Sequence, residues 1–321
     1  MKLIKTFAKI AVSLALIWIV VRAFDMKGVF HYLLQVDAGA VLLVIICALG
    51  VVPLHTLRWQ IAVEVSGNHM PFRTALQIVL IGHFFNQTLP SSVGGDAVRI
   101  WCACRAGLGV GDAIRTVILD RAISLIGLLL MAGAGLPWLF GLVTDPAARF
   151  AIAAVVAAGI GGFVVFIALP QLPRPLLKWR VIRAVAELSI LARRLTLTPR
   201  YVIPILGLAV AGFVVFVFIV YWLATALHLE MRFTDCLLLV PPVLLVSVIP
   251  VSIAGWGVRE GAMVVAFGFI NVPPSAAFAV SVLFGLTIAA ASLPGALLWL
   301  MSGYSAKNLE EAAALAERDA A

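Results

Sequence analysis

Two polar interruptions in otherwise apolar sequence carry the residues that could do chemistry. The first reads FFNQTLPSSVGGDAVRIW at residues 84–101, and the second reads IPVSIAGWGVREGA at residues 249–262. The second repeats the first at a constant separation of 160 positions, and the matched pairs are Pro90 and Pro250, Ser92 and Ser252, Gly95 and Gly255, and Arg99 and Arg259. A repeated interruption of this kind indicates a site that is built from two similar halves.

The chemistry that these residue types predict is anion binding. Proline lacks an N–H group and breaks the helical hydrogen-bond ladder, while glycine lets the backbone turn sharply and approach a ligand. A helix that starts after Gly95, and another after Gly255, would each present free N–H groups with partial positive charge. With Arg99 and Arg259 one turn further on, each interruption is expected to offer a site for a phosphate-like group.

The candidate substrate-binding residues are the polar, glycine and proline positions of both interruptions and one nearby charged pair. They are Asn86, Pro90, Ser91, Ser92, Gly94, Gly95, Asp96, Arg99, Asp120, Arg121, Pro250, Ser252, Gly255, Trp256, Gly257, Arg259 and Glu260. No catalytic residue is assigned among them.

A purely structural interpretation competes with this assignment. In this interpretation Asp96 does no more than cap the short helix after Gly95. Arg99 does no more than reach the lipid headgroups or pair with an acid. Likewise, Glu260 does no more than pair with an arginine, and Asp120 and Arg121 form an ion pair at the membrane interface. Ionisable groups within a membrane are costly and usually functional, so two arginines at matched positions favour the functional interpretation.

Neither a metal nor another cofactor is predicted. His83 is expected to be a packed polar residue, because no other histidine lies near it in sequence. The four cysteines are expected to behave as small apolar residues, since no histidine stands at ligand spacing from them.

The composition indicates an integral membrane protein. The chain has 321 residues, of which 63% are hydrophobic and 12% charged, and its mean hydropathy is +1.12. Uncharged runs of about 18 or more apolar residues are typical of bilayer spans. The net charge of +8 is expected to reflect basic cytoplasmic loops rather than binding to nucleic acid.

The apolar runs predict an all-α polytopic protein with six spanning helices and two re-entrant broken-helix hairpins. The spans are expected at about 9–21, 38–55, 114–137, 150–169, 201–227 and 276–301, and the hairpins at about 75–104 and 237–269. Arg58 and Trp59 are expected at the membrane interface just past the second span, before a polar loop at 63–73. We interpret residues 1–321 as one transmembrane domain.

This arrangement divides the domain into two repeats of opposite orientation. Repeat 1 covers about 38–142 and repeat 2 about 201–302, with a basic amphipathic linker at 171–200 and a charged tail at 303–321. The distribution of lysine and arginine places both termini in the cytoplasm. Inverted repeats with discontinuous helices are a recurring plan of secondary transporters. Gly95 and Gly255 are therefore expected to meet near the membrane centre, with Arg99 and Arg259 facing a shared cavity.

The two interruptions also resemble the signature segments of a known family. FNQTLPSSVGGDAVR, DRAISL at residues 120–125, IPVSIAGWGVREGA and the Leu57-Arg58-Trp59 segment are similar to the lysylphosphatidylglycerol synthase transmembrane (flippase-like) family. Ser91 and Ser92 stand where many members have Pro-Gly. The resemblance implies a lipid-translocating membrane domain. The same unit is similar to the membrane part of the bacterial multiple peptide resistance factor, in which a cytosolic aminoacyltransferase domain follows. Here the sequence stops after a short tail, so we expect no such domain and no lysyl-lipid synthesis.

Three functions follow as hypotheses. The first is a lipid transporter of a bacterial inner membrane that binds anionic phospholipid, polyprenyl lipid or glycolipid and uses alternating access. The sequence has no G-x-x-x-x-G-K-[ST] motif, so ATP is not expected to drive it directly. The second is an intramembrane lipid-pyrophosphate phosphatase, suggested by Pro90-Ser91-Ser92. The third is a scaffold that recruits a lipid-modifying enzyme. An oligomer is compatible with all three.

Overall fold

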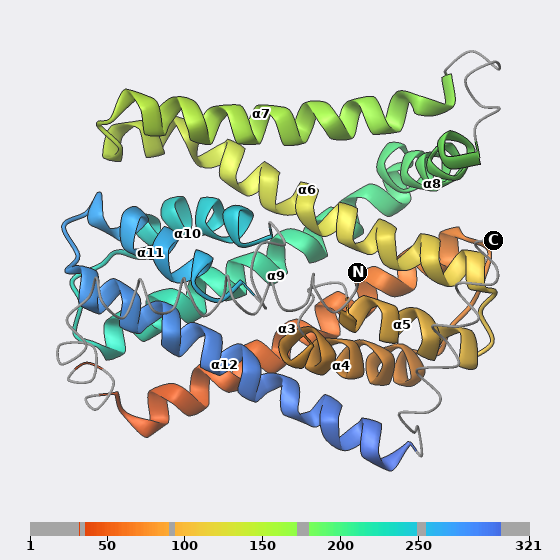
Figure 1. Ribbon diagram of the computed structural model, residues 1–321, viewed down its shortest axis with the longest axis horizontal. Coiled ribbons are helices and arrows are strands. Elements are labelled where there is room, and N and C mark those ends of the chain that lie inside the picture. Colours follow the sequence, from red (N-terminus) through yellow and green to blue (C-terminus); the bar gives the residue numbers. More distant parts are fainter. Residues whose placement is uncertain (1–31, 33–35, 90–93, 172–179, 249–254, 303–321) are drawn as a thin grey trace, which may run out of the picture.

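The described part of the chain is entirely helical. The computed structural model describes residue 32 and residues 36–89, 94–171, 180–248 and 255–302, and no strand occurs within them. The helices are α3 (Ala38–Val65), α4 (Phe72–Thr88), α5 (Gly94–Arg105), α6 (Val110–Leu142), α7 (Pro146–Ala168), the short 3-10 helix η1 (Leu169–Gln171), α8 (Arg180–Leu197), α9 (Pro199–Ala226), α10 (Phe233–Ser247), α11 (Val258–Gly268) and α12 (Pro274–Met301) (Figure 1). The predicted all-α class is confirmed.

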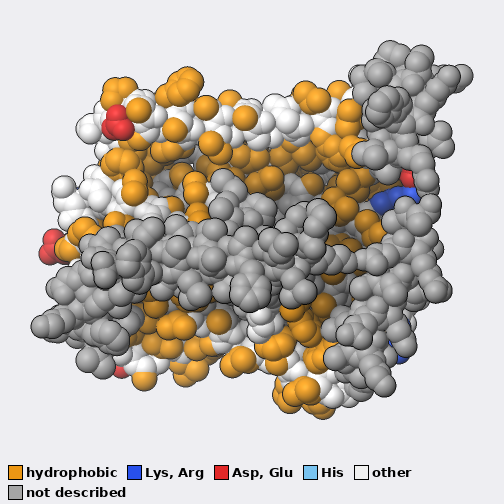
Figure 2. All heavy atoms as spheres, in the orientation of Figure 1, with side chains coloured by type: hydrophobic (Ala, Val, Ile, Leu, Met, Phe, Trp, Pro, Cys, Tyr) orange, Lys and Arg blue, Asp and Glu red, His pale blue; other side chains and the backbone are white. Residues whose placement is uncertain are grey.

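Five helices in the described residues are long and apolar enough to cross a membrane. They are α3, α6, α7 with η1, α9 and α12. The sequence predicted six spans, and the first of these lies outside the described residues. Figure 2 shows apolar side chains across the middle of the molecule, with the few visible charged ones towards the ends of its long axis. This distribution fits a multi-pass membrane protein, whose middle zone would face lipid.

Helix α3 continues further than the sequence predicted. It runs to Val65, through the residues expected to start a polar loop at Val63, and Gly67 with a φ of 86° follows it. Arg58 and Trp59, which were expected at the membrane interface, are both buried inside the protein. Neighbouring helices therefore surround these two side chains, and their depth in a membrane stays a prediction.

Helices α4 and α5 form the first hairpin, and α10 and α11 form the second. The predicted hairpin at 75–104 corresponds to Phe72–Arg105, and the one at 237–269 to Phe233–Gly268. Figure 1 shows the first hairpin towards one end of the bundle and the second towards the other. Pro90, Ser91, Ser92, Pro250 and Ser252 fall in the connections between these helices and lie outside the described residues.

The helix lengths follow the predicted duplication. Helices α3, α4, α5 and α6 have 28, 17, 12 and 33 residues, and α9, α10, α11 and α12 have 28, 15, 11 and 28. Helices α3 and α9 pack side by side and run in opposite directions (Figure 1). These features agree with two related halves, and their inversion across a bilayer stays a prediction.

Helix α8 occupies the predicted basic linker. Its inner positions, Ser189, Ala192 and Leu195, are buried, and the Ser189 hydroxyl donates to the carbonyl of Phe166 in α7. Glu187 accepts from Arg115 of α6 at 2.6 Å. Part of the apolar stripe of α8 therefore packs on the protein.

A close approach between α4 and α12 provides a test of the packing. A β-carbon at Gly295 would overlap the backbone carbonyl of Leu80 and press on Phe84. We predict that Gly295→Ala lowers stability by about 1–3 kcal/mol because backbone must move, although alanine is the better helix former. Thermal unfolding in detergent measures the effect. Gly50→Ala in α3, where no heavy atom lies within 4 Å, should be neutral or stabilising, and equal losses in both variants would contradict the packing argument.

Candidate functional site

A buried cluster joins α3, α5 and α6 around one carboxylate. Arg58 Nε donates to Asp120 Oδ1 at 2.7 Å, and Arg99 Nη1 donates to Asp120 Oδ2 at 3.1 Å. The Arg99 guanidinium also lies over the Trp59 ring, 4.9 Å from its centroid. Arg58, Arg99 and Asp120 are 3%, 5% and 2% exposed. We call Arg58, Trp59, Arg99 and Asp120 the arginine cluster.

The cluster carries more positive than negative charge. Two guanidinium groups share the single carboxylate of Asp120. The adjacent pair is balanced, because Asp96 accepts from both Arg121 Nε at 2.7 Å and Arg121 Nη2 at 2.9 Å. Asp96 therefore pairs across to α6 from the first turn of α5, which differs from its predicted role as a cap. Asp96 also lies 3.7 Å from Arg99 Nη1. Counted together, Arg58, Arg99 and Arg121 face the two carboxylates of Asp96 and Asp120, so one positive charge remains without a counter-ion among these residues.

Several buried donors of the cluster have no acceptor among the described residues. They are Arg58 Nη1, Trp59 Nε1, Arg99 Nε and Arg99 Nη2. An unpaired buried donor costs about 1–3 kcal/mol, and more for a charged group. Free donors together with an excess positive charge indicate a place for an anionic acceptor.

Asn86 lies next to this cluster on the first hairpin. Its Oδ1 atom is buried and has no donor among the described residues. A β-carbon at Gly95 would overlap this side chain and the carbonyl of Gly82. A β-carbon on Gly82 would in turn meet the Arg99 side chain. The two glycines therefore let α4 and α5 approach closely around Arg99.

Arg259 of the second hairpin has a different set of partners. Its guanidinium donates to Glu260 Oε1 and to Ser281 Oγ, and it lies 4.8 Å from the centroid of the Trp256 ring. A β-carbon on Gly285 would overlap it. Among the described residues this second cluster leaves no buried side-chain donor or acceptor unpaired. The second cluster contains the same kinds of residue as the first, namely an arginine, a tryptophan, a carboxylate and a glycine. Unlike those of the first, its buried polar side-chain atoms find their partners within the described part of the protein.

At the start of α11, where the sequence predicted an anion site, one N–H group already has a partner within the protein. Gly255 and Gly257 have φ values of 79° and 87°, and the helix begins after Gly257. The Gly257 N–H donates to Glu260. The helix start is therefore not entirely free, because the Glu260 carboxylate accepts from one of its N–H groups; anion binding there stays a prediction. In the first hairpin, Gly94 at the start of α5 packs against Leu89.

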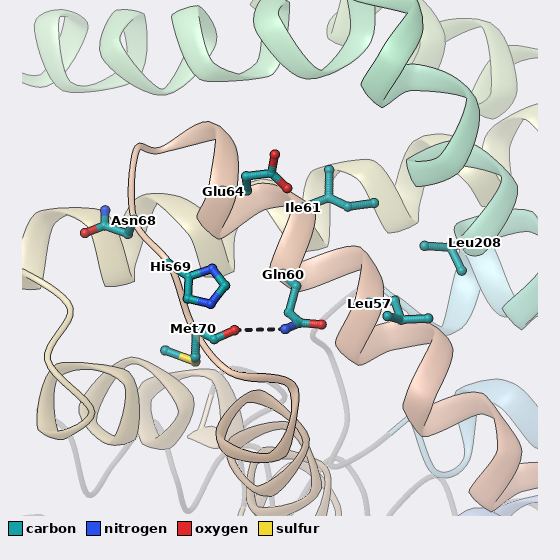
Figure 3. Close-up of a pocket in the computed structure, with 8 residues that line it drawn as sticks. All are labelled: Leu57, Gln60, Ile61, Glu64, Asn68, His69, Met70 and Leu208. Atoms are coloured by element: carbon teal, nitrogen blue, oxygen red, sulfur yellow. Dashed lines mark hydrogen bonds between the residues drawn. The ribbon is translucent and has the colours of Figure 1, made fainter.

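Neither Arg99 nor Arg259 lines any of three cavities found in the described part of the chain. One cavity of about 330 Å³ lies between the end of α3, the following loop and α9. Figure 3 shows Leu57, Gln60 and Glu64 following one another along α3, with His69 beside them and Leu208 of α9 opposite. The expected shared cavity between Arg99 and Arg259 stays a prediction.

Sequence reasoning missed two features of this region. Arg58 and Trp59 belong to the arginine cluster although they were not among the candidate residues. A buried arginine in the long apolar helix α3 is the signal that could have found them. The second feature is a contact between His55 and His83, whose ring nitrogens lie 3.2 Å apart. In the described residues no group of three metal-ligating side chains occurs.

Comparison with known proteins adds one finding. The family model described as "Lysylphosphatidylglycerol synthase TM region" matches residues 6–295. The chain belongs to this family. No curated protein matches the chain. The family match covers both hairpins and the arginine cluster, and it agrees with the resemblance carried by the two interruptions.

The shared carboxylate generates a prediction on stability. We expect Asp120→Asn to destabilise this family member by about 3–5 kcal/mol, because it leaves two buried arginines without their anion. The measurement is thermal or denaturant unfolding in detergent. Asp112→Asn is the control, since Asp112 pairs with Arg115 where both side chains are about a third exposed, and such pairs contribute at most about 1 kcal/mol. Similar losses in both variants would show that Asp120 is not the centre of the cluster.

Proposed function

We propose that this protein moves a lipid with a phosphate-bearing headgroup between the leaflets of a bacterial inner membrane. The observation that carries the proposal is the arginine cluster, which has a net positive charge and four buried donors without an acceptor among the described residues. Guanidinium groups bind phosphate through several N–H groups in a fixed fork. A phosphate at this position would accept from Arg58, Arg99 and Trp59 together.

The surroundings of the cluster support a lipid as the carrier of that phosphate. The helices that hold it expose large apolar side chains, such as Leu42, Ile46 and Ile118. A further apolar cavity of about 450 Å³ lies between α6, α9 and α10, lined among others by Trp138 and Leu237. We infer that the headgroup enters the protein while the acyl chains stay against such apolar surface.

The two hairpins supply a plausible physical basis for movement. In our proposal the halves are inverted repeats, and each hairpin enters the bilayer from a different side. Broken helices of this kind form the substrate sites of many secondary transporters. Alternating access would then expose the arginine cluster to one leaflet and afterwards to the other. The basic residues near α8 would face the cytoplasm, where positive loops are retained.

The charges of the arginine cluster allow the effect of a substitution on lipid binding to be separated from its effect on folding. Arg99→Met keeps the approximate volume of the side chain and leaves Arg58 and Asp120 as a balanced pair. We therefore predict that it retains a thermal midpoint within a few degrees of the wild type. Lipid movement should fall at least tenfold, because loss of one charged hydrogen-bond partner costs about 1.5–3 kcal/mol.

The assay reconstitutes the protein into vesicles that contain fluorescent phosphatidylglycerol and measures how much label dithionite can reach over time. Arg115→Met provides the matched control, because this arginine forms a partly exposed ion pair with Glu187 and should leave the rate unchanged. Wild-type rates in both Arg99→Met and Arg58→Met would refute the proposed phosphate site. Phosphate release from a polyprenyl pyrophosphate, without lipid movement, would instead favour a phosphatase.

A further inference from the structure

A pair of buried histidines lies beside the arginine cluster. His55 Nδ1 on α3 and His83 Nε2 on α4 are 3.2 Å apart, and their ring centroids are 5.2 Å apart with an interplanar angle of 16°. His55 precedes Arg58 by one helical turn. His83 follows Gly82, which packs against the Arg99 side chain. The pair thus connects to both arginines of the cluster through short stretches of backbone.

The geometry of the pair suits one additional proton. When both rings are neutral, one N–H···N bond joins them, and one nitrogen of the contact must act as the acceptor. An added proton on an outer ring nitrogen keeps this bond and makes its donor charged, which strengthens it. A second added proton would place a positive charge on each of the two adjacent rings, so like-charge repulsion opposes it.

The charged groups around the pair come from three helices. They are Arg58 on α3, Arg99 on α5, and Asp120 and Arg121 on α6. The contacts of the pair on α9 and α12 are uncharged: His55 packs against Gly212 and Phe216 of α9, and the cavity beside His83 is lined on α12 by Ile288, Ala291 and Ser292. While the arginine cluster is empty, burial of both rings opposes an extra proton, and so does the excess charge, since three arginines face only the two carboxylates of Asp120 and of Asp96, which pairs with Arg121.

A proton has a place from which to reach the pair. The cavity beside His83 has a volume of about 20 Å³, which is enough for one water molecule. Ser292, whose hydroxyl donates to the Ala289 carbonyl, offers that water a polar neighbour. Of the two rings, His83 is the one that lines this cavity.

We infer that the His55–His83 pair binds a proton when the anionic headgroup binds, so that the proton and the lipid are transported together. This inference rests on the proposed function, because it requires an anion at the arginine cluster. The negative headgroup removes part of the positive field that opposes the proton. By linkage, the bound proton raises the affinity for the headgroup by the same factor. The coupling ion is therefore H⁺, and its site is distinct from the phosphate site.

Calorimetry on the purified protein in detergent tests the coupling without requiring transport. The probe is dihexanoylphosphatidylglycerol, whose phosphodiester stays ionised at neutral pH, so any proton taken up belongs to the protein. Titrations at several pH values between about 5 and 7.5, each in two buffers of different ionisation enthalpy, count the protons. We expect uptake that grows towards one proton per lipid as the pH falls below neutrality, and an affinity that weakens by up to about tenfold per pH unit as the pH rises.

The variants His55→Gln, His83→Gln and their combination remove the titrating rings. In the combination the two amides can still hydrogen-bond between α3 and α4, so retained lipid binding reports an intact fold. We expect proton uptake and the pH dependence of affinity to disappear. His69→Gln is the matched control, because this histidine lies in the cavity of Figure 3, away from the pair, and it should behave as wild type.

The possible outcomes separate the two proposals. Lipid binding by the wild type without proton uptake, or undiminished uptake in the double variant, would overturn the histidine inference and leave the transport proposal standing. Absence of lipid binding and of lipid movement in the wild type would overturn the transport proposal, and the coupling with it. Uptake that is lost only in the pair variants supports both.

Discussion

One carboxylate shared by two buried arginines is the constraint on which the first half of the protein depends. Asp120 on α6 holds Arg58 from α3 and Arg99 from α5, and ions removed from water must be paired to be tolerated. The surrounding residues accommodate this requirement. Gly82 leaves space for the Arg99 side chain, and Trp59 covers its guanidinium with a ring face. Helices α3, α5 and α6 are thereby fixed relative to one another around a charge that is only partly neutralised.

The second half has a similar set of helices but neutralises its buried arginine in a different way. Position 280, which corresponds to Asp120 at a separation of 160, is a valine, and the neighbouring Ser281 contacts Arg259 instead. The carboxylate comes from Glu260, the next residue along α11, so the ion pair is local. The two hairpins are thus related in backbone and unlike in electrostatics. This asymmetry places the proposed headgroup site in the first half and assigns the second a structural part.

The sequence allowed the frame to be predicted better than the contacts. The repeat at 160 positions and the apolar runs predicted both helix pairs and the five helices in the described residues that are long and apolar enough to span a membrane, because these depend on local composition. The length of α3 was missed, since packing rather than polarity decides where it ends. The partner of Asp96 was missed because Arg121 lies 25 residues away. The contact between His55 and His83, 28 residues apart, likewise has no signature in local spacing.

The energetics of the arginine cluster argue that it is held ready for a ligand. Stability alone would be better served by one arginine opposite Asp120, which would balance the charge and leave fewer donors unpaired. The additional guanidinium therefore acts against the stability of the unoccupied protein. An anionic headgroup would reverse that effect, and a proton on the neighbouring histidines would be favoured at the same moment. A site that is under-satisfied when empty and satisfied when loaded gives the bound state its driving force without requiring a tight, slowly released complex.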